Sequence, residues 1–201
     1  MLTKTWFHTG AFLRGEKILI QFENEYFQND PVPEKVLPEP LLPAGLITDE
    51  YRQALRACKG FLLRKEVYAL DTNNNPGNPY ITEEHNCLIR CLQPQGSNKY
   101  RVFLTHESET ITYHYERNPQ DPRTAQTFIF DVDDYGNIIS SADVVYPRTT
   151  NPIPADEQID LHIVYTENSY TNDIQQDFDY RIPVLYSTIK YEVKLIPKLP
   201  G

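Results

Sequence analysis

The sequence predicts a mainly β protein of antiparallel strands and hairpins, with one short helix near residues 49–59. Fourteen Tyr and nine Phe against one Met and one Trp favour half-buried strands, because a pleated surface packs aromatic rings while their polar tips stay in water. Alternating runs of apolar and polar residues are separated by Gly, Pro and Asn, which is typical of strands joined by turns. A chain of 201 residues can bury one substantial core, and we expect a single β-rich segment over 1–201.

The strongest pattern runs from Ile111 to Pro147, which we interpret as one β-hairpin. Apolar residues alternate with more polar ones on both arms, at Phe128, Phe130 and Val132 before the turn and at Ala142, Val144 and Tyr146 after it. Such alternation predicts a sheet with one buried face. Between the arms, Gly136 can adopt positive φ without steric cost and Asn137 tolerates it, so the residues of the turn specify its shape.

Turn-forming residues divide the rest of the chain. Recurrent prolines in 30–47 remove backbone donors and predict an extended connector. Residues 48–60 predict the short helix, because Thr48 offers an N-cap and Gly60 follows the last turn. We expect strands and hairpins throughout 61–196. The strand-like runs there are 62–70, 83–93, 101–105, 159–166 and 187–195, with a polar excursion over 168–183 and one or two further strands within 5–27.

The charge balance excludes two classes of partner. The formal net charge is −9 and the sequence pI is near 5.0, and the chain has no basic run of the kind that binds a phosphate backbone or an anionic lipid surface. No window approaches the ~20 apolar residues that span a bilayer, and the first ten residues lack the pattern of a signal peptide. We expect no nucleic-acid partner and no direct membrane contact.

Three cysteines, Cys58, Cys87 and Cys91, fit neither a disulfide scaffold nor a zinc knuckle. We expect them to be reduced, with Cys87 and Cys91 on one face of a strand because they lie four residues apart. His85 lies near Cys87, but no second ligand pair has the usual spacing. The sequence therefore predicts no metal site and no cofactor.

No constellation for catalysis stands out. His8 has no Ser or Cys nucleophile in an elbow-like turn beside it, and we expect it to bind backbone groups in a turn. His114 lies between Tyr113 and Tyr115, so in a strand either the histidine or the tyrosine pair is buried. We therefore predict no catalytic residue, and a hydrolase or transferase would need a triad or carboxylate pair that the sequence does not reveal.

Two charged groups invite other interpretations. An oxygen-rich loop, which could hold Ca²⁺, is formed by Asp131, Asp133, Asp134 and Asn137. The ligand spacing of an EF-hand is absent, and we interpret the loop as a turn. Arg123 is expected to pair with Asp121 or Glu116 and to orient a loop, a contact worth no more than about 1 kcal/mol at an exposed site.

Several short motifs of this sequence resemble those of a known family. Residues 113–117, 121–123 and 133–137, reading YHYER, DPR and DDYGN, are similar to the region that follows the propeller in the B component of bacterial insecticidal toxin complexes, within the wider Rhs/YD-repeat group. Further motifs similar to that region occur in the same order at 4–11, 57–60, 63–71, 165–172 and 179–183. Cys58 and the tail from Leu195 to Gly201 depart from the pattern.

The resemblance implies a structural role. Such B components pair with a C component, an Rhs-repeat protein, to build a hollow shell of spiralling β-strands around a toxic C-terminal polypeptide, which a pore-forming A component delivers. The chain is then a non-enzymatic piece of an Rhs-like shell wall, excised from a larger polypeptide and secreted or extracellular within the toxin complex. The residues expected to fix this architecture are Trp6, Phe7, Tyr113, Tyr115, Arg123, Tyr135, Gly136 and Asn137.

One other class of function stays open at the level of sequence. A stand-alone β-sandwich module that binds glycan or protein on a cell surface would expose aromatic rings on one face. Candidate stacking pairs are Tyr165 with Tyr170 and Tyr180 with Tyr186.

Overall fold

The structure is a computed structural model that describes residues 1–11, 22–28, 37, 40–148 and 158–194. It divides the chain into two compact units, Met1–Thr124 and Ala125–Gly201. The described residues form antiparallel strands with a single α-helix, α1 (Thr48–Ala57). The predicted fold class, mainly β with one short helix, is confirmed.

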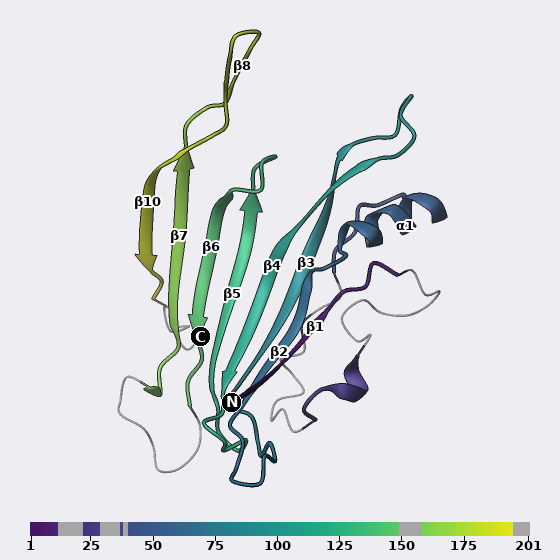
Figure 1. The fold of residues 1–201 in the computed structure, drawn as a ribbon. Helices are drawn as coiled ribbons and strands as arrows, with labels where there is room; N and C mark the ends of the chain where they lie inside the picture. Colours follow the sequence, from purple (N-terminus) through teal and green to yellow (C-terminus); the bar gives the residue numbers. More distant parts are fainter. Residues whose placement is uncertain (12–21, 29–36, 38–39, 149–157, 195–201) are drawn as a thin grey trace, which may run out of the picture. The chain divides into compact units, whose positions relative to one another are not determined.

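The first unit is a set of four antiparallel strands in the order β1-β2-β3-β4 (Figure 1). Their bounds are β1 Leu2–Phe7, β2 Leu62–Tyr68, β3 Ile81–Gln93 and β4 Val102–His114. In the register, Trp6 of β1 lies opposite Arg64 of β2, and Arg64 lies opposite Glu84 of β3. These three side chains therefore share one face of the sheet.

The helix begins one residue away from the predicted cap. Ile47 holds the N-cap position, and Thr48 is the first helical residue. The carboxylate of Glu50 accepts a hydrogen bond from the backbone N–H of Ile47 at 3.1 Å, which satisfies one of the amides that a helix start leaves unpaired. The helix ends at Ala57, with Cys58 as its C-cap, two residues earlier than the predicted end near residue 59.

One face of these strands carries the core of the first unit. Tyr113 and Tyr115 are both buried and stack at 5.9 Å between ring centroids, whereas His114 is only half-buried. The sequence left open whether His114 or the two tyrosines are buried, and the structure shows that the tyrosines are. A second cluster joins Ala54 and Cys58 at the end of α1 to Cys87 and Ile89 of β3.

A buried ion pair lies beside this core. The side chains of Arg64 and Glu66 are 2% and 0% exposed, with Nε of Arg64 2.7 Å from a carboxylate oxygen of Glu66. Glu66 also accepts hydrogen bonds from the backbone N–H of Phe27 at 2.8 Å and from the Tyr68 hydroxyl at 2.5 Å. The ring of Tyr26 lies 5.0 Å from the guanidinium of Arg64, and burial raises the pKa of Tyr26 to about 12.

The same network bears on the prediction of one or two strands within 5–27, which β1 meets in part and which is wrong where it extends to Tyr26. Within 5–27 the described strand is β1, and residues Glu23–Glu25 form a 3₁₀ helix, while Ile18 and Ile20 lie outside the described residues. Because the N–H of Phe27 donates to the carboxylate of Glu66, that amide is not available to a sheet ladder. Most of the proline-rich connector, 30–47, also lies outside the described residues.

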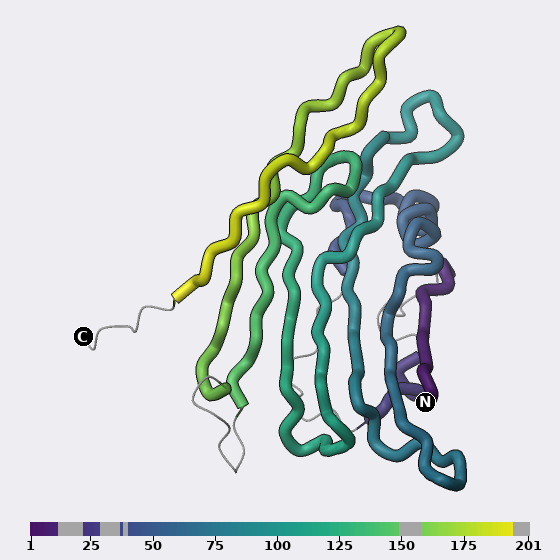
Figure 2. The backbone as a smooth tube through the Cα atoms, turned by 60° about the vertical axis from the view of Figure 1, so that its left-hand side comes forward, coloured from purple at the N-terminus to yellow at the C-terminus, as the bar shows by residue number. Residues whose placement is uncertain are grey.

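The second unit has its own antiparallel strands, in the order β5-β6-β7-β10 (Figures 1 and 2). Their bounds are β5 Arg123–Val132, β6 Ile138–Val145, β7 His162–Tyr170 and β10 Leu185–Glu192. The predicted hairpin around Gly136 is the β5–β6 pair. β4, which was expected over 101–105, extends to His114. The motif around Tyr113 therefore belongs to the preceding hairpin, formed by β3 and β4, and not to the β5–β6 hairpin.

The predicted polar excursion over 168–183 is only partly irregular. β7 continues to Tyr170, and β8 (Ile174–Gln176) pairs with β9 (Asp179–Arg181) as a separate two-stranded sheet. The short strands were missed because their residues are mostly polar and exposed, so the burial alternation that marks a strand is absent.

We expect the Arg64→Met variant to lose about 3–5 kcal/mol of unfolding free energy, because it leaves the charge of Glu66 buried without its cation. Denaturant unfolding followed by the fluorescence of Trp6, the only tryptophan, measures this. The matched control is Lys65→Met on the opposite face of β2. There the ammonium of Lys65 lies 3.2 Å from the carboxylate of Glu83, and both side chains are partly exposed. The loss of unfolding free energy in this control should not exceed about 1 kcal/mol. Equal losses in the two variants would contradict the assigned role of Arg64.

Candidate functional site

The Asp133 turn joins β5 to β6 and contains three of the expected architectural residues. One carboxylate oxygen of Asp133 accepts hydrogen bonds from the backbone N–H groups of Tyr135 and Asn137, both at 2.9 Å. The other accepts from the side-chain amide of Asn137 at 2.8 Å. Gly136 has φ 83°, a left-handed conformation that favours glycine. The turn chemistry predicted for Gly136 is confirmed, although the carboxylate of Asp133 was not predicted to organise it.

These bonds bear on the calcium alternative. Both oxygens of Asp133 already serve the turn. Among the residues that the structure describes, no group of three or more His, Cys, Asp or Glu side chains is arranged to hold a metal ion. The Asp133 loop therefore behaves as a side-chain-stabilised turn.

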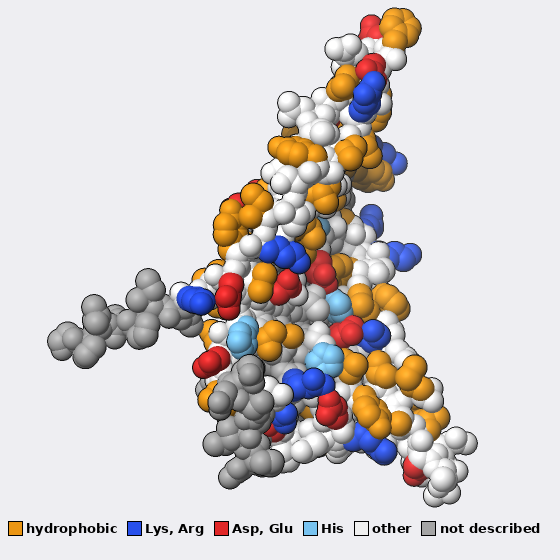
Figure 3. Space-filling view, turned by 90° about the vertical axis from the view of Figure 1, so that its left-hand side faces the viewer, with side chains coloured by type: hydrophobic (Ala, Val, Ile, Leu, Met, Phe, Trp, Pro, Cys, Tyr) orange, Lys and Arg blue, Asp and Glu red, His pale blue; other side chains and the backbone are white. Residues whose placement is uncertain are grey.

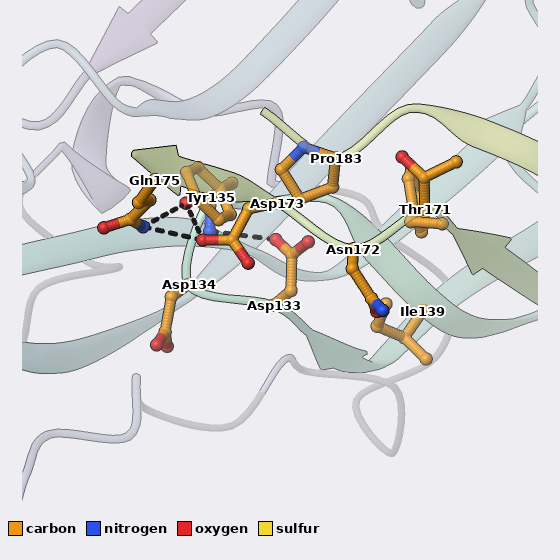
Figure 4. A pocket seen from close by; sticks show the side chains of 10 residues that line it. Asp133, Asp134, Tyr135, Ile139, Thr171, Asn172, Asp173, Gln175 and Pro183 are labelled. Atoms are coloured by element: carbon orange, nitrogen blue, oxygen red, sulfur yellow. Dashed lines mark hydrogen bonds between the residues drawn. The ribbon is translucent and has the colours of Figure 1, made fainter. Parts of the chain in front are cut away.

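Tyr135 connects this turn to the segment that follows β7. Its hydroxyl donates to a carboxylate oxygen of Asp173 at 2.8 Å, and the side-chain amide of Gln175 donates to the Tyr135 hydroxyl at 3.0 Å and to Asp173 at 2.6 Å (Figure 4). The bond to Asp173 raises the pKa of Tyr135, and the bond from Tyr135 lowers the pKa of Asp173. The three side chains thus form a closed hydrogen-bonded triangle.

The triangle borders a pocket of about 520 Å³ in the second unit. Figure 4 shows the side chains of Asp133 and Asp173 next to each other, and Pro183 and Thr171 also line the pocket. Each of these two carboxylates accepts hydrogen bonds from neighbouring residues. The arrangement is suited to holding two chain segments together.

A second connection lies at the end of β4 in the first unit. Glu116 and Arg117 have φ 51° and 71°, which costs energy for residues with a side chain. Backbone bonds to Tyr80 and Pro79 support this pair, and the guanidinium of Arg117 lies 6.0 Å from the ring of Tyr80. Arg123 pairs with Glu116, one of its two expected partners, at an exposed site. The positive φ values had no signal in the sequence.

Trp6 and Phe7 point to opposite faces of β1. The indole N–H of Trp6 donates to Glu25 at 2.9 Å, and its ring meets Tyr26 edge-on at 5.1 Å. Phe7 is 50% exposed. Next to them, the buried His8 accepts a hydrogen bond from the N–H of Gly10 at 3.0 Å, and burial lowers its pKa. His8 therefore lies in a turn and binds backbone, as we predicted.

Sequence reasoning missed an aromatic row on one face of the second unit. Phe128 of β5 lies opposite Ala142, Ala142 opposite Tyr165, and Tyr165 opposite Tyr191. Successive rings along Phe128, Phe130, Tyr165 and Tyr191 are 6.2–6.3 Å apart. Phe130 is 61% exposed, so the prediction that its face is buried is wrong at this position. The alternation of apolar and polar residues places Phe130 on that face. It does not reveal which other part of the protein covers the face.

The surface near β8, β9 and β10 is also rich in exposed apolar side chains. Figure 3 shows them along the two-stranded β8–β9 sheet and beside it. The largest exposed fractions there belong to Phe178, Tyr186, Tyr180 and Val184. Among the described residues, no helix is long and apolar enough to cross a membrane.

Comparison with known proteins identifies the family. The family model of the insecticide toxin TcdB middle/C-terminal region matches residues 53–182. The chain belongs to this family. The resemblance inferred from the sequence motifs is thereby confirmed, and the matched range includes the C-terminal half of α1, the Asp133 turn and the β8–β9 sheet.

Solved structures of TcdB2 complexes are similar to most of the chain. A TcdB2–TccC3 crystal structure is 28% identical, with a TM-score of 0.75, over 94% of this chain and 10% of that one. A TcdB2–TccC3–Cdc42 crystal structure is 26% identical with a TM-score of 0.73, and a Photorhabdus luminescens Tc holotoxin pore is 26% identical with a TM-score of 0.69, over the same shares. The chain spans about a tenth of the length of these chains. No curated protein sequence matches it.

We expect Tyr135→Phe to raise the pKa of Asp173 toward its ordinary value, because the hydroxyl that stabilises the carboxylate is removed. A pH titration of the Asp173 side-chain carbon signal by NMR measures the shift. Tyr180→Phe, which keeps the Tyr135 hydroxyl, is the control and should leave the titration unchanged. An unchanged Asp173 titration in Tyr135→Phe would show that the triangle does not form in solution.

Proposed function

We propose that this segment of the TcdB toxin component is a non-enzymatic part of a β-shell that encloses and protects a toxic C-terminal cargo for delivery. The family match over residues 53–182 is the observation that carries the proposal. The similar solved structures are complexes of TcdB2 with TccC3 and a Tc holotoxin pore. We therefore propose a C component and an A component pore as partners, and an extracellular location within that toxin complex.

The arrangement of the strands supports a wall-building role. Among the strands that the structure describes, β1 ends the order of the first unit and β10 ends that of the second, so each presents an outer edge of backbone N–H and C=O groups to these strands' surroundings. Such edges pair readily with further strands. In a wall, the neighbouring parts of the polypeptide supply those strands, and continuous pairing closes the surface to protease and solvent.

The expected architectural residues have complementary positions in this proposal. Tyr113 and Tyr115 fill the core of the first unit, and Trp6 binds Glu25 beside it. Tyr135, Gly136 and Asn137 shape the Asp133 turn, and Arg123 pairs with Glu116 after β4. We propose that these residues fix the shape of the wall. Phe7 is exposed on β1, and we propose a contact with a neighbouring part of the wall for it.

A second candidate function is favoured by the aromatic row. Exposed Phe130 and Tyr191, with Tyr165 between them, are the rings on one face that a glycan- or protein-binding module needs. Sugar rings stack on such surfaces. This alternative requires the row to face solvent in the native assembly, whereas the shell proposal allows the rest of the polypeptide or the cargo to cover it.

Protease protection tests the shell. In the complex of the complete B component with its C component, we expect the cargo to stay intact under a protease dose that degrades free cargo. Cleavage at equal rates would overturn the proposal. In Arg64→Met complexes that assemble, cargo cleavage should accelerate, while Lys65→Met complexes should protect as well as the parent.

Glycan-array binding tests the alternative. If the aromatic row binds sugars, Phe130→Ala should reduce binding of the complete B component at least tenfold, because stacking area is lost. Phe7→Ala removes another exposed ring, which lies outside the row, and should have no effect on glycan binding. Absence of glycan binding by the parent protein would leave the row without a sugar-binding function.

A further inference from the structure

Two buried thiols from distant parts of the first unit lie in contact. Cys58 and Cys87 are each 0% exposed, and their sulfur atoms are 3.9 Å apart although 29 residues separate them in sequence. Cys58 is the C-cap of α1, and Cys87 lies in β3 directly after a register shift at Asn86.

The surroundings hold both sulfurs in place. Ala54 and Ile89 complete the buried cluster around them. The sulfur of Cys58 is 3.9 Å from the carbonyl oxygen of Ala54 and 4.0 Å from the hydroxyl of Thr105. α1 is also tied down by Glu50, whose carboxylate lies 2.6 Å from Nε of Arg101. α1 is therefore anchored near its start by Glu50 and at its C-cap by the cluster around Cys58.

We propose that Cys58 and Cys87 are the site of an intramolecular disulfide that ties the end of α1 to β3. The oxidant is a small-molecule disulfide of the glutathione type. The Cys58 thiolate attacks it, forms a mixed disulfide and releases one glutathione thiolate. Cys87 then loses its proton and attacks the Cys58 sulfur, forming the protein disulfide and releasing a second glutathione. The two protein thiols lose two electrons and two protons, and the glutathione disulfide gains them.

The contact distinguishes the two sulfurs. The contact between the two sulfurs lowers the pKa of Cys58, whereas the same contact, together with burial, raises the pKa of Cys87. Cys58 is thus the sulfur that ionises first. A disulfide places its sulfurs about 2.05 Å apart, so side-chain rotation and a small shift of the helix end have to close the remaining gap.

Burial sets the kinetics of the reaction. Both sulfurs are covered in the folded unit, so the oxidant reaches Cys58 only when the end of α1 opens, and the closed product is shielded from reductants in the same way. Cys91, in contrast, is partly exposed and lies near Arg101. It is the competing thiol, and it has no sulfur neighbour among the described residues.

The test uses the complete native gene product under non-denaturing conditions. Reduced protein is incubated with oxidised glutathione, quenched with acid, alkylated with N-ethylmaleimide in denaturant, and mapped by mass spectrometry. We expect a Cys58–Cys87 disulfide peptide that has lost two hydrogens, with Cys91 alkylated or carrying glutathione. Dithiothreitol should reverse the link only slowly unless denaturant is present.

Two variants keep the outcome interpretable. Cys91→Ser removes the competitor and should retain the cross-linked peptide, whereas Cys87→Ala should lose it and leave Cys58 alkylated or glutathionylated. Full alkylation of Cys58 and Cys87 in the parent protein after prolonged oxidation would overturn the proposal. So would a link from either of them to Cys91, since that pairing requires unfolding of the observed cluster.

Discussion

The buried carboxylate of Glu66 is the constraint on which the first unit depends. A charge without access to water is tolerated only when donors surround it, and here they come from Arg64, Tyr68 and the backbone of Phe27. Meeting that requirement draws the segment around Tyr26 onto β2 and places Trp6 against it. Because Arg64 also pairs with Glu84, the same interaction connects β2 and β3 side to side. One desolvated group therefore organises three separate stretches of chain.

The second unit is organised by a carboxylate at its surface. Asp133 satisfies the amides of its own turn, and the Tyr135 hydroxyl carries the connection onward to Asp173 and Gln175. Exposed hydrogen bonds of this kind contribute little stability singly, but they define the direction in which the β5–β6 turn points. In both units, antiparallel strands are thus combined with a hydrogen-bonded carboxylate that positions an irregular segment: Glu66 in the first unit and Asp133 in the second. In the wall that we propose, directional bonds maintain the shape together with the core.

Membership in the TcdB family carries the functional proposal, and the strand order that ends at β1 and β10 is compatible with it. The chain spans about a tenth of the length of its structural relatives, and the shell proposal leaves some of its surfaces to be covered by partners. The aromatic row and the apolar residues near the β8–β9 sheet belong to such surfaces. The cluster of Cys58 and Cys87 differs from them, because its burial arises wholly within the first unit.

The sequence by itself determined the fold class, the β5–β6 turn with its glycine, the helix to within two residues at its end, and the family. These features follow from local chemistry: alternation along a strand, the φ preference of Gly136 and the termination of α1 before Gly60. Only the tertiary structure decided that the Tyr113 pair is buried, that Phe130 is exposed, that Glu66 lies at the centre of a buried network, and that Cys58 meets Cys87. Each of these depends on contacts between residues far apart in the chain, and local pattern carries no information about which distant segment covers a given face.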